Sequence, residues 1–138
     1  MSLRTPHSAL RICFVVPGFP TDETDWFKPA VTETILAMSK RYDIYVVTLR
    51  YPEKQMHYRI QDIPVSSVVK GRIRTIKSGL DYIRKEHRRK PFHLIHAFWG
   101  TMSGMTGAIA SLRLGIPLIV TCAGGEPVAR DDIHYGDW

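Results

Sequence analysis

The residues best suited to chemistry in this chain stand at the ends of short apolar runs. The run "FHLIHAFWG" (92–100) closes with a histidine, an aromatic pair and a glycine, and "PLIVTC" is followed by "AGGEP". Glutamate and histidine can hydrogen-bond hydroxyl groups, and an aromatic ring can face a sugar. Paired glycines let backbone N–H groups come close to a ligand. These residue types favour a site that contacts a sugar or a phosphate.

Each of these residues also has an ordinary structural explanation. His96 could be a hydrogen-bonded core histidine, and "AGGEP" could be a tight turn with a solvated or helix-capping glutamate. A buried tryptophan needs an acceptor for its indole N–H, which makes Trp99 harder to explain by packing alone. We take as candidate substrate-binding residues Gly18, His96, Trp99, Gly124, Gly125 and Glu126. We assign no catalytic residue in this chain.

Several other kinds of site are not expected. The chain has no G-x-x-x-x-G-K-[ST] motif, and "GTMSGMTG" does not fit G-x-G-x-x-G, so P-loop and dinucleotide sites are excluded. The first apolar run ends in Val-Pro-Gly, without an acidic cluster that could hold magnesium. Cys13 and Cys122 lack metal or redox spacing, and both are predicted to be buried free thiols. No metal and no permanently bound cofactor are predicted.

Strand-like and helix-like patterns alternate along the chain. Apolar, β-branched runs predict strands at 11–16, 43–49, 92–98 and 117–122, with a weaker candidate at 57–63. Apolar residues at helical spacing predict three helices, with the stripes Val31, Ile35, Met38, Tyr42; Val69, Ile73, Ile76, Leu80, Ile83; and Met105, Ala108, Ile109, Leu112. Gly104 and Gly107 are expected to let the third helix approach the sheet closely.

These patterns predict an α/β fold with a doubly wound, mainly parallel, Rossmann-like sheet and helices on both faces. Unbroken apolar strands suit a parallel sheet covered on both sides, and the first strand should be interior. Ligands in such sheets bind beyond the carboxyl ends of the strands. The loops there should therefore converge on one edge.

The positive charge is concentrated in one segment. The net charge is +6, and nine basic residues lie between Lys70 and Lys90 against only Asp81 and Glu86. A solvated helix face is the default interpretation, and a basic amphipathic helix resting on anionic lipid is the sharper one. The weak membrane or anion patch would comprise Arg84, Lys85, Arg88, Arg89 and Lys90. No DNA- or RNA-binding motif is present, so nucleic acid is not an expected partner.

Length and hydropathy place further bounds on the protein. A chain of 138 residues suits one domain. We expect residues 1–10 to be a flexible segment, whose "MSL" start is typical of an expression remnant, and residues 11–138 to be one domain, incomplete at its C-terminus. No apolar run approaches the roughly 18 residues that span a bilayer. The expected location is cytoplasmic, with the inner face of the membrane as an option.

The order of these motifs resembles a known family. The segment "RICFVVPGFPTDETDWFKPAVTETILAMSKRYDIYVVTLRYP" resembles the opening of the group 1 retaining, two-domain (GT-B) glycosyltransferases. "FHLIHAFWG" is similar to their "D-v-I-H-a-h-w-g" strand end, and "GIPLIVTCAGGEP" to their "gip-v-vT-hGgd/e" segment. Three features depart from the family pattern: a first loop with only Gly18 in place of Gly-Gly, Phe98 in place of a second histidine, and Ala123 in place of a histidine.

The resemblance implies half of a GT-B fold, with the active site in the cleft between two Rossmann-like domains. This chain would be the acceptor-side domain of a hexosyltransferase-like enzyme of carbohydrate or glycolipid biosynthesis. The full enzyme would move a sugar from a nucleotide-sugar to a saccharide or lipid-linked acceptor with retention. A C-terminal domain, absent from this sequence, would hold the donor, so this chain alone should be inactive.

Two alternatives remain open at this stage. The chain could be a free-standing flavodoxin-like module that binds a small ligand at the same edge. It could also be a membrane-docking module without catalysis that uses the basic helix.

Overall fold

The structure is a computed structural model that describes residues 10–25, 29–68 and 70–122. Residues 1–9, most of the segment expected to be flexible, lie outside this range. The elements in chain order are β1 (Arg11–Gly18), α1 (Pro29–Ser39), β2 (Asp43–Tyr51), β3 (Met56–Ile60), β4 (Ile63–Ser67), α2 (Arg72–Arg89), β5 (Leu94–Phe98), α3 (Met102–Leu114) and β6 (Leu118–Thr121).

The described strands form one six-stranded sheet in the order β3-β4-β2-β1-β5-β6. All neighbours are parallel except the pair β3 and β4. Strand β1 is interior, between β2 and β5, as its uniformly apolar sequence predicts. The predicted doubly wound, mainly parallel Rossmann-like sheet is confirmed.

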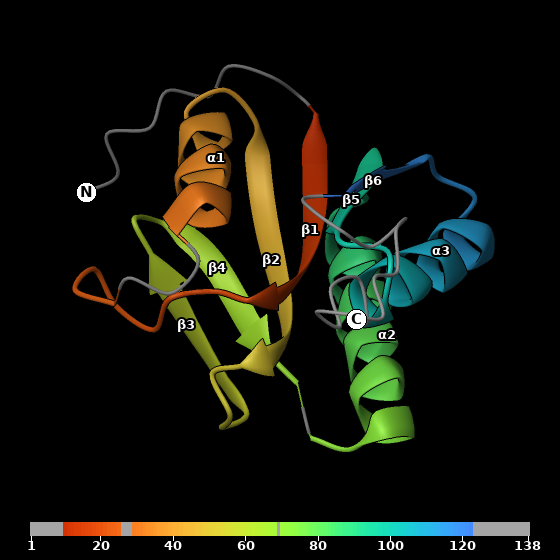
Figure 1. The fold of residues 1–138 in the computed structure, drawn as a ribbon. Helices are drawn as coiled ribbons and strands as arrows, with labels where there is room; N and C mark the ends of the chain where they lie inside the picture. Colours follow the sequence, from red (N-terminus) through yellow and green to blue (C-terminus); the bar gives the residue numbers. More distant parts are fainter. Residues whose placement is uncertain (1–9, 26–28, 69, 123–138) are drawn as a thin grey trace, which may run out of the picture.

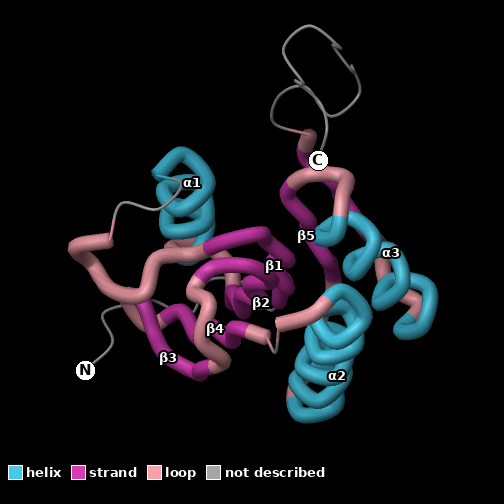
Figure 2. The backbone as a smooth tube through the Cα atoms, turned by 60° about the horizontal axis from the view of Figure 1, so that its bottom comes forward, coloured by secondary structure: helices cyan, strands magenta, loops and turns pink. Residues whose placement is uncertain are grey.

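The helices cover both faces of the sheet (Figures 1 and 2). Helix α1 lies on one face, and α2 and α3 lie together on the other. Alternation along β1 separates the two cores: Phe14 packs in the cluster that contains Ile35 of α1, while Cys13 packs in the cluster that contains Ile83 of α2. Burial raises the pKa of the Cys13 thiol. The prediction for Cys122 was wrong, since this thiol is exposed just after β6.

The weak strand predicted at 57–63 is a hairpin. Strand β3 turns at Gln61 and Asp62, which have φ angles of 46° and 70°, and β4 returns antiparallel to it before pairing in parallel with β2. Positive φ at both central residues is the geometry of the tight hairpin turn. The usual Asn-Gly or Asp-Gly signal is absent, so the sequence pattern did not reveal the turn.

The apolar stripe predicted for α2 was wrong at Ile73. Its side chain is 81% exposed, and the buried residues of the helix are Thr75, Gly79 and Ile83, of which the predicted stripe included only Ile83. Val69 of the stripe lies outside the described residues. A Cβ added at Gly79 would lie 3.3 Å from the side chains of Leu49 and Thr106. The small residues therefore face the sheet and α3, because only they allow so close an approach of the backbones.

Helix α3 also buries a different face from the one that its apolar stripe predicted. The predicted stripe leaves Met105 53% and Leu112 85% exposed. The buried residues of this helix are Ser103, Gly104, Thr106, Gly107 and Ala110. A Cβ at Gly107 would stand 3.0 Å from Leu118 and 3.3 Å from Ala97. The prediction that Gly104 and Gly107 bring this helix close to the sheet is confirmed, although the apolar stripe faces elsewhere.

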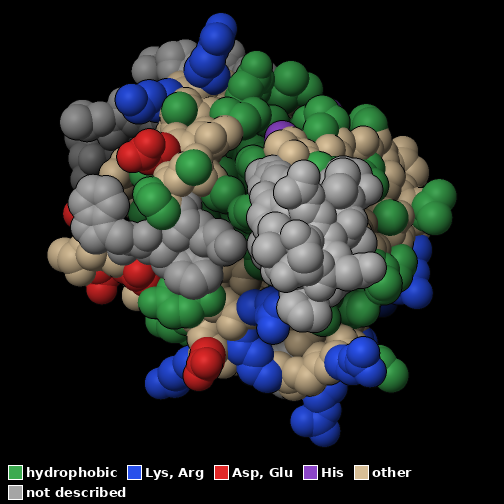
Figure 3. All heavy atoms as spheres, in the orientation of Figure 1, with side chains coloured by type: hydrophobic (Ala, Val, Ile, Leu, Met, Phe, Trp, Pro, Cys, Tyr) green, Lys and Arg blue, Asp and Glu red, His purple; other side chains and the backbone are tan. Residues whose placement is uncertain are grey.

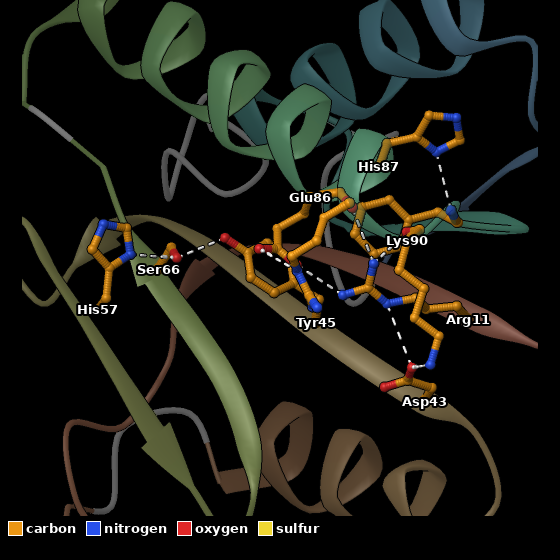
Figure 4. A network of polar contacts seen from close by, with 10 residues as sticks. Arg11, Asp43, Tyr45, His57, Ser66, Glu86, His87 and Lys90 are labelled. Carbon is orange, nitrogen blue, oxygen red and sulfur yellow. Dashed lines mark hydrogen bonds and ion pairs between the residues drawn. The ribbon is translucent and has the colours of Figure 1, made fainter.

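A buried arginine joins the end of α2 to the start of the sheet (Figure 4). Arg11 is 2% exposed, and its guanidinium lies 2.8 Å from a Glu86 carboxylate oxygen and 3.5 Å from Asp43. It also lies over the ring of Phe92, 4.5 Å from the centroid. Lys90 pairs with Asp43 at 2.8 Å. This network fixes the C-terminal end of α2 at the amino edge of the strands.

Candidate functional site at the carboxyl edge of the sheet

The parallel strands end at one edge, where β1 and β5 lie side by side. Val15 pairs with Ala97, so Gly18 and Trp99, a few residues further along, reach the same edge. Gly18 pairs with Tyr51 at the end of β2. The backbone N–H of Trp99 donates to the carbonyl of Thr121 at the end of β6 (2.8 Å). The structure thus brings two of the predicted site residues, Gly18 and Trp99, to a common edge, here called the rim.

Trp99 is held in an unusual backbone conformation at this rim. Its φ is 70°, and its side chain is 7% exposed in the core cluster on the α1 face. A non-glycine residue in the left-handed region costs of order 1–3 kcal/mol and persists only where the surroundings enforce it. Its carbonyl lies 3.0 Å from the position a Cβ would take at Gly104, so α3 comes close to the rim here only because residue 104 has no side chain. Trp99 therefore shapes the rim from within the core.

His96 lies one step below the rim, in a largely apolar setting. Its ring stacks with those of Phe14 (5.0 Å between centroids) and Phe98 (4.9 Å). Its Nε2 is 2.7 Å from the Thr121 hydroxyl. Partial burial lowers the pKa of His96. A neutral imidazole in this position orients the ends of β5 and β6, which is close to the core explanation that the sequence left open.

A polar cluster at the rim was not among the sequence predictions. One oxygen of Asp25 accepts hydrogen bonds from the Thr21 amide (3.1 Å), the Thr21 hydroxyl (3.2 Å) and the Tyr51 hydroxyl (2.7 Å). The hydrogen bond to Asp25 raises the pKa of Tyr51. The polar residues of this cluster are visible in the sequence, in the loop "PTDETD" and the strand end "LRYP". Only the pairing of β1 with β2 shows that they meet. The cluster sets a carboxylate in the loop that follows β1, bonded to the side chain of Tyr51 at the end of β2.

Three predicted residues, Gly124, Gly125 and Glu126, lie outside the described residues. The segment that carries them follows Thr121, whose carbonyl and hydroxyl bond Trp99 and His96. Their place at the rim stays a prediction.

The basic patch predicted at the end of α2 lies at the opposite edge of the sheet. Arg84 pairs with Asp81 (3.5 Å), Arg89 with Glu86 (3.0 Å) and Lys90 with Asp43 (2.8 Å). Lys85 and Arg88 are exposed. Much of this charge is thus compensated within the fold, and the five residues take no part in the rim.

Other kinds of site are absent from the described part of the chain. Residues 10–25, 29–68 and 70–122 contain no group of three or more His, Cys, Asp or Glu that could hold a metal ion. Within the same ranges, no helix is long and apolar enough to cross a membrane. A small pocket between α2 and α3 is lined by Leu80, Ile83 and Ala110, among others. Arg84 also lines it, but no rim residue does.

Comparison with known proteins identifies the family. The sequence profile of the glycosyl transferase 4-like domain matches residues 28–138. The chain belongs to this family. The glycosyl transferase 4-like domain explains why strands, rim loops and helices follow the order that the sequence resemblance suggested. It also confirms the assignment to glycosyltransferases at the level of general glycosyl transfer.

One solved structure agrees with the fold of this glycosyl transferase 4-like domain. Sucrose-phosphate synthase from Thermosynechococcus elongatus matches 93% of the chain with a TM-score of 0.64 and 14% identity. The match covers 37% of that enzyme, so the chain spans about a third of its length. The C-terminal domain of the PF1911 hydrogenase from Pyrococcus furiosus is more distant, with a TM-score of 0.45, 10% identity, and coverage of 85% of this chain and 95% of that one. No curated protein sequence matches.

Proposed function

We propose that this glycosyl transferase 4-like domain is the acceptor-side half of an enzyme that moves a sugar from a nucleotide-sugar to an acceptor hydroxyl with retention. The observation that carries the proposal is the rim, where Gly18, Trp99 and the carboxylate of Asp25 gather at the ends of neighbouring strands. Binding at this edge is the rule for open α/β sheets. The family match supports the reaction class.

The rim residues have distinct roles in this proposal. Gly18 leaves room for a sugar to approach the end of β1, and Trp99 shapes the rim beside it from within the core. His96 holds β5 and β6 in register through Thr121. Gly124, Gly125 and Glu126 complete the acceptor site, with Glu126 accepting hydrogen bonds from acceptor hydroxyls. Asp25, positioned by Thr21 and Tyr51, supplies a second carboxylate acceptor.

The nucleotide-sugar would be held mainly by a partner domain across the cleft. Helix N-termini and basic side chains would stabilise the diphosphate leaving group as charge develops on it. The acceptor is a saccharide or a lipid-linked sugar. On this view the 138-residue chain binds the acceptor but does not turn over alone.

The test uses the complete coding chain with a panel of nucleotide-sugars and acceptors. Transfer to an acceptor is measured by product formation, and the anomeric configuration of the product is read by NMR. We expect retention, and inversion of configuration would refute the mechanism.

The rim assignment is tested by single substitutions in that enzyme. Glu126→Gln should lower kcat/KM by tens- to hundreds-fold, about 2–3 kcal/mol, the scale of a charged hydrogen bond. Asp25→Asn should cause a similar fall. Asp22→Asn is the matched control, because Asp22 lies in the same loop, is exposed, and its side chain accepts hydrogen bonds from the amide and hydroxyl of the nearby Thr24. Equal activity in all three variants would show that the rim carboxylates do not bind the acceptor.

The remaining alternative is a free-standing module that binds a small ligand at the same rim. The parallel sheet and its rim fit this alternative too, since the fold alone does not specify a reaction. The two are separated by whether the complete coding chain transfers sugar at all.

A further inference from the structure

The start of α2 forms a second basic surface that differs from the predicted patch. Residues 70–77 contain four basic side chains and no acidic one. Arg72, Arg74 and Lys77 are exposed, and none of them pairs with an acidic side chain in the described part of the chain. The C-terminal end of the helix differs, because three of its cations have carboxylate partners.

This surface lies at the rim. Helix α2 follows β4, which runs parallel to β2, so the helix begins at the carboxyl edge of the sheet (Figure 1). Lys70 confirms the position, since its ammonium group donates to the carbonyls of Leu49 (3.3 Å) and Arg50 near the end of β2. Figure 3 shows Lys and Arg side chains gathered along the lower edge of the molecule, in the region where α2 begins.

An exposed apolar side chain stands among these cations. Ile73 is 81% exposed, between Arg72 and Arg74. An exposed isoleucine flanked in sequence by arginines suits the boundary between lipid headgroups and acyl chains, where both kinds of side chain find partners.

The cations at this end of α2 are also unfavourable for the helix dipole, whose N-terminal end is positive. Helix α2 begins with no acidic residue in its first turn and no side-chain cap. Cations at the positive end of a helix dipole are destabilising by a few tenths of a kcal/mol each. A local conflict of this kind is relieved when the surface meets an anionic partner, and such conflicts concentrate at functional surfaces.

We propose that residues 70–77, with Ile73 at their centre, dock on an anionic lipid surface. Three exposed cations, Arg72, Arg74 and Lys77, match the negative charge of lipid headgroups, and Ile73 enters the interface with them. Docking needs no catalysis and does not depend on the proposed function. If the chain is also a transferase half, docking at this end brings the rim close to the membrane, which suits a lipid-linked acceptor; that consequence rests on the proposed function.

The experiment compares two triple variants that remove the same charge from the two ends of α2. The rim-end variant is Arg72→Gln, Arg74→Gln and Lys77→Gln, and the control is Arg84→Gln, Lys85→Gln and Arg88→Gln. The two trios are centred about 17 Å apart along the helix axis. Binding is measured by co-sedimentation with phosphatidylcholine vesicles that do or do not contain phosphatidylglycerol.

We expect the unmodified 138-residue chain to bind only the vesicles that contain phosphatidylglycerol, and less tightly as salt is raised. Each cation near the surface contributes about fivefold, so the rim-end variant should bind about a hundredfold more weakly. The control variant should bind within a few fold of the unmodified chain. Thermal unfolding checks both folds, and the rim-end variant should be no less stable because it removes charges that oppose the helix dipole.

A second pair of variants tests the apolar part. Ile73→Ser should weaken vesicle binding about fivefold, whereas Leu112→Ser, at an equally exposed apolar residue on α3, should leave it unchanged. Absent vesicle binding, equal losses in the two triple variants, or tighter binding to single-stranded RNA than to the vesicles would each overturn the proposal.

Discussion

His96 is the residue whose environment has the clearest consequence for behaviour in solution. Its imidazole stacks with the rings of Phe14 and Phe98, and burial lowers its pKa. The folded state therefore takes up this proton at a lower pH than the unfolded chain, whose histidine pKa is about 6.5. Stability from this residue is full above about pH 6.5 and falls as the pH drops below that value. His96→Gln should flatten the pH dependence of the unfolding free energy below about pH 6.5.

The matching control for that measurement is His57→Gln. His57 is exposed, with one nitrogen 2.7 Å from the Ser66 hydroxyl (Figure 4). The unfolding free energy of both variants is measured by denaturant unfolding across the pH range. If the two variants have equal pH profiles, His96 does not carry the acid sensitivity.

Trp99 affects folding as well as the rim. Its side chain is 7% exposed in the core cluster on the α1 face. Trp99→Ala should lower the unfolding free energy by about 3–5 kcal/mol, the usual cost of truncating a large buried aromatic. Chemical denaturation of the 138-residue chain measures it, and a loss below about 1 kcal/mol would mean that the indole is not part of the core.

At the scale of the elements, the close contact of α3 with the end of β5 depends on Gly104. A Cβ at Gly104 would meet the Trp99 carbonyl at 3.0 Å, and backbone cannot swing aside as a side chain can. Gly104→Ala should cost about 1–3 kcal/mol of stability through this clash and displace the rim. Gly100→Ala is the control, because a Cβ there meets nothing within 4 Å. Thermal unfolding of the two variants should separate them, and equal melting temperatures would contradict the packing explanation.

The buried arginine network makes a second prediction at this scale. Arg11 holds the end of α2 against β1 and β2 through Glu86 and Asp43. Partial burial works to raise the pKa of Glu86, but hydrogen bonds from Arg89 and Arg11 hold it below its ordinary value. Arg11→Met should cost about 3–5 kcal/mol, since it leaves carboxylates without their buried partner. Arg84→Met, at an exposed surface pair, should cost under about 1 kcal/mol; denaturant unfolding compares the two.

At the scale of the whole molecule, the strands that the structure describes form one sheet with one rim, and in the proposal the donor is held by another domain. The isolated chain should therefore bind nucleotide-sugars weakly or not at all. Calorimetry against a panel of nucleotide-sugars tests this prediction. Micromolar binding by the 138-residue chain would instead favour the free-standing ligand-binding module.

The sequence by itself determined the strands other than the β3–β4 hairpin, their layering and the position of β1. Long β-branched runs such as 11–16 can only be buried on both faces, and that requires a parallel sheet with helices on each side. The same runs placed Gly18 and Trp99 at a common edge, because parallel strands end together. These features follow from local composition, which does not change when the chain folds.

Only the tertiary structure decided which face each helix buries and which polar groups meet. Periodicity shows that Ile73 or Leu112 can be buried, but backbone approach at Gly79 and Gly107 turned both outward. Asp25 and Tyr51 are 26 positions apart, and only the pairing of β1 with β2 brings them within 2.7 Å. Both outcomes depend on distances between elements, and these are set when the core closes rather than by the sequence of any one segment.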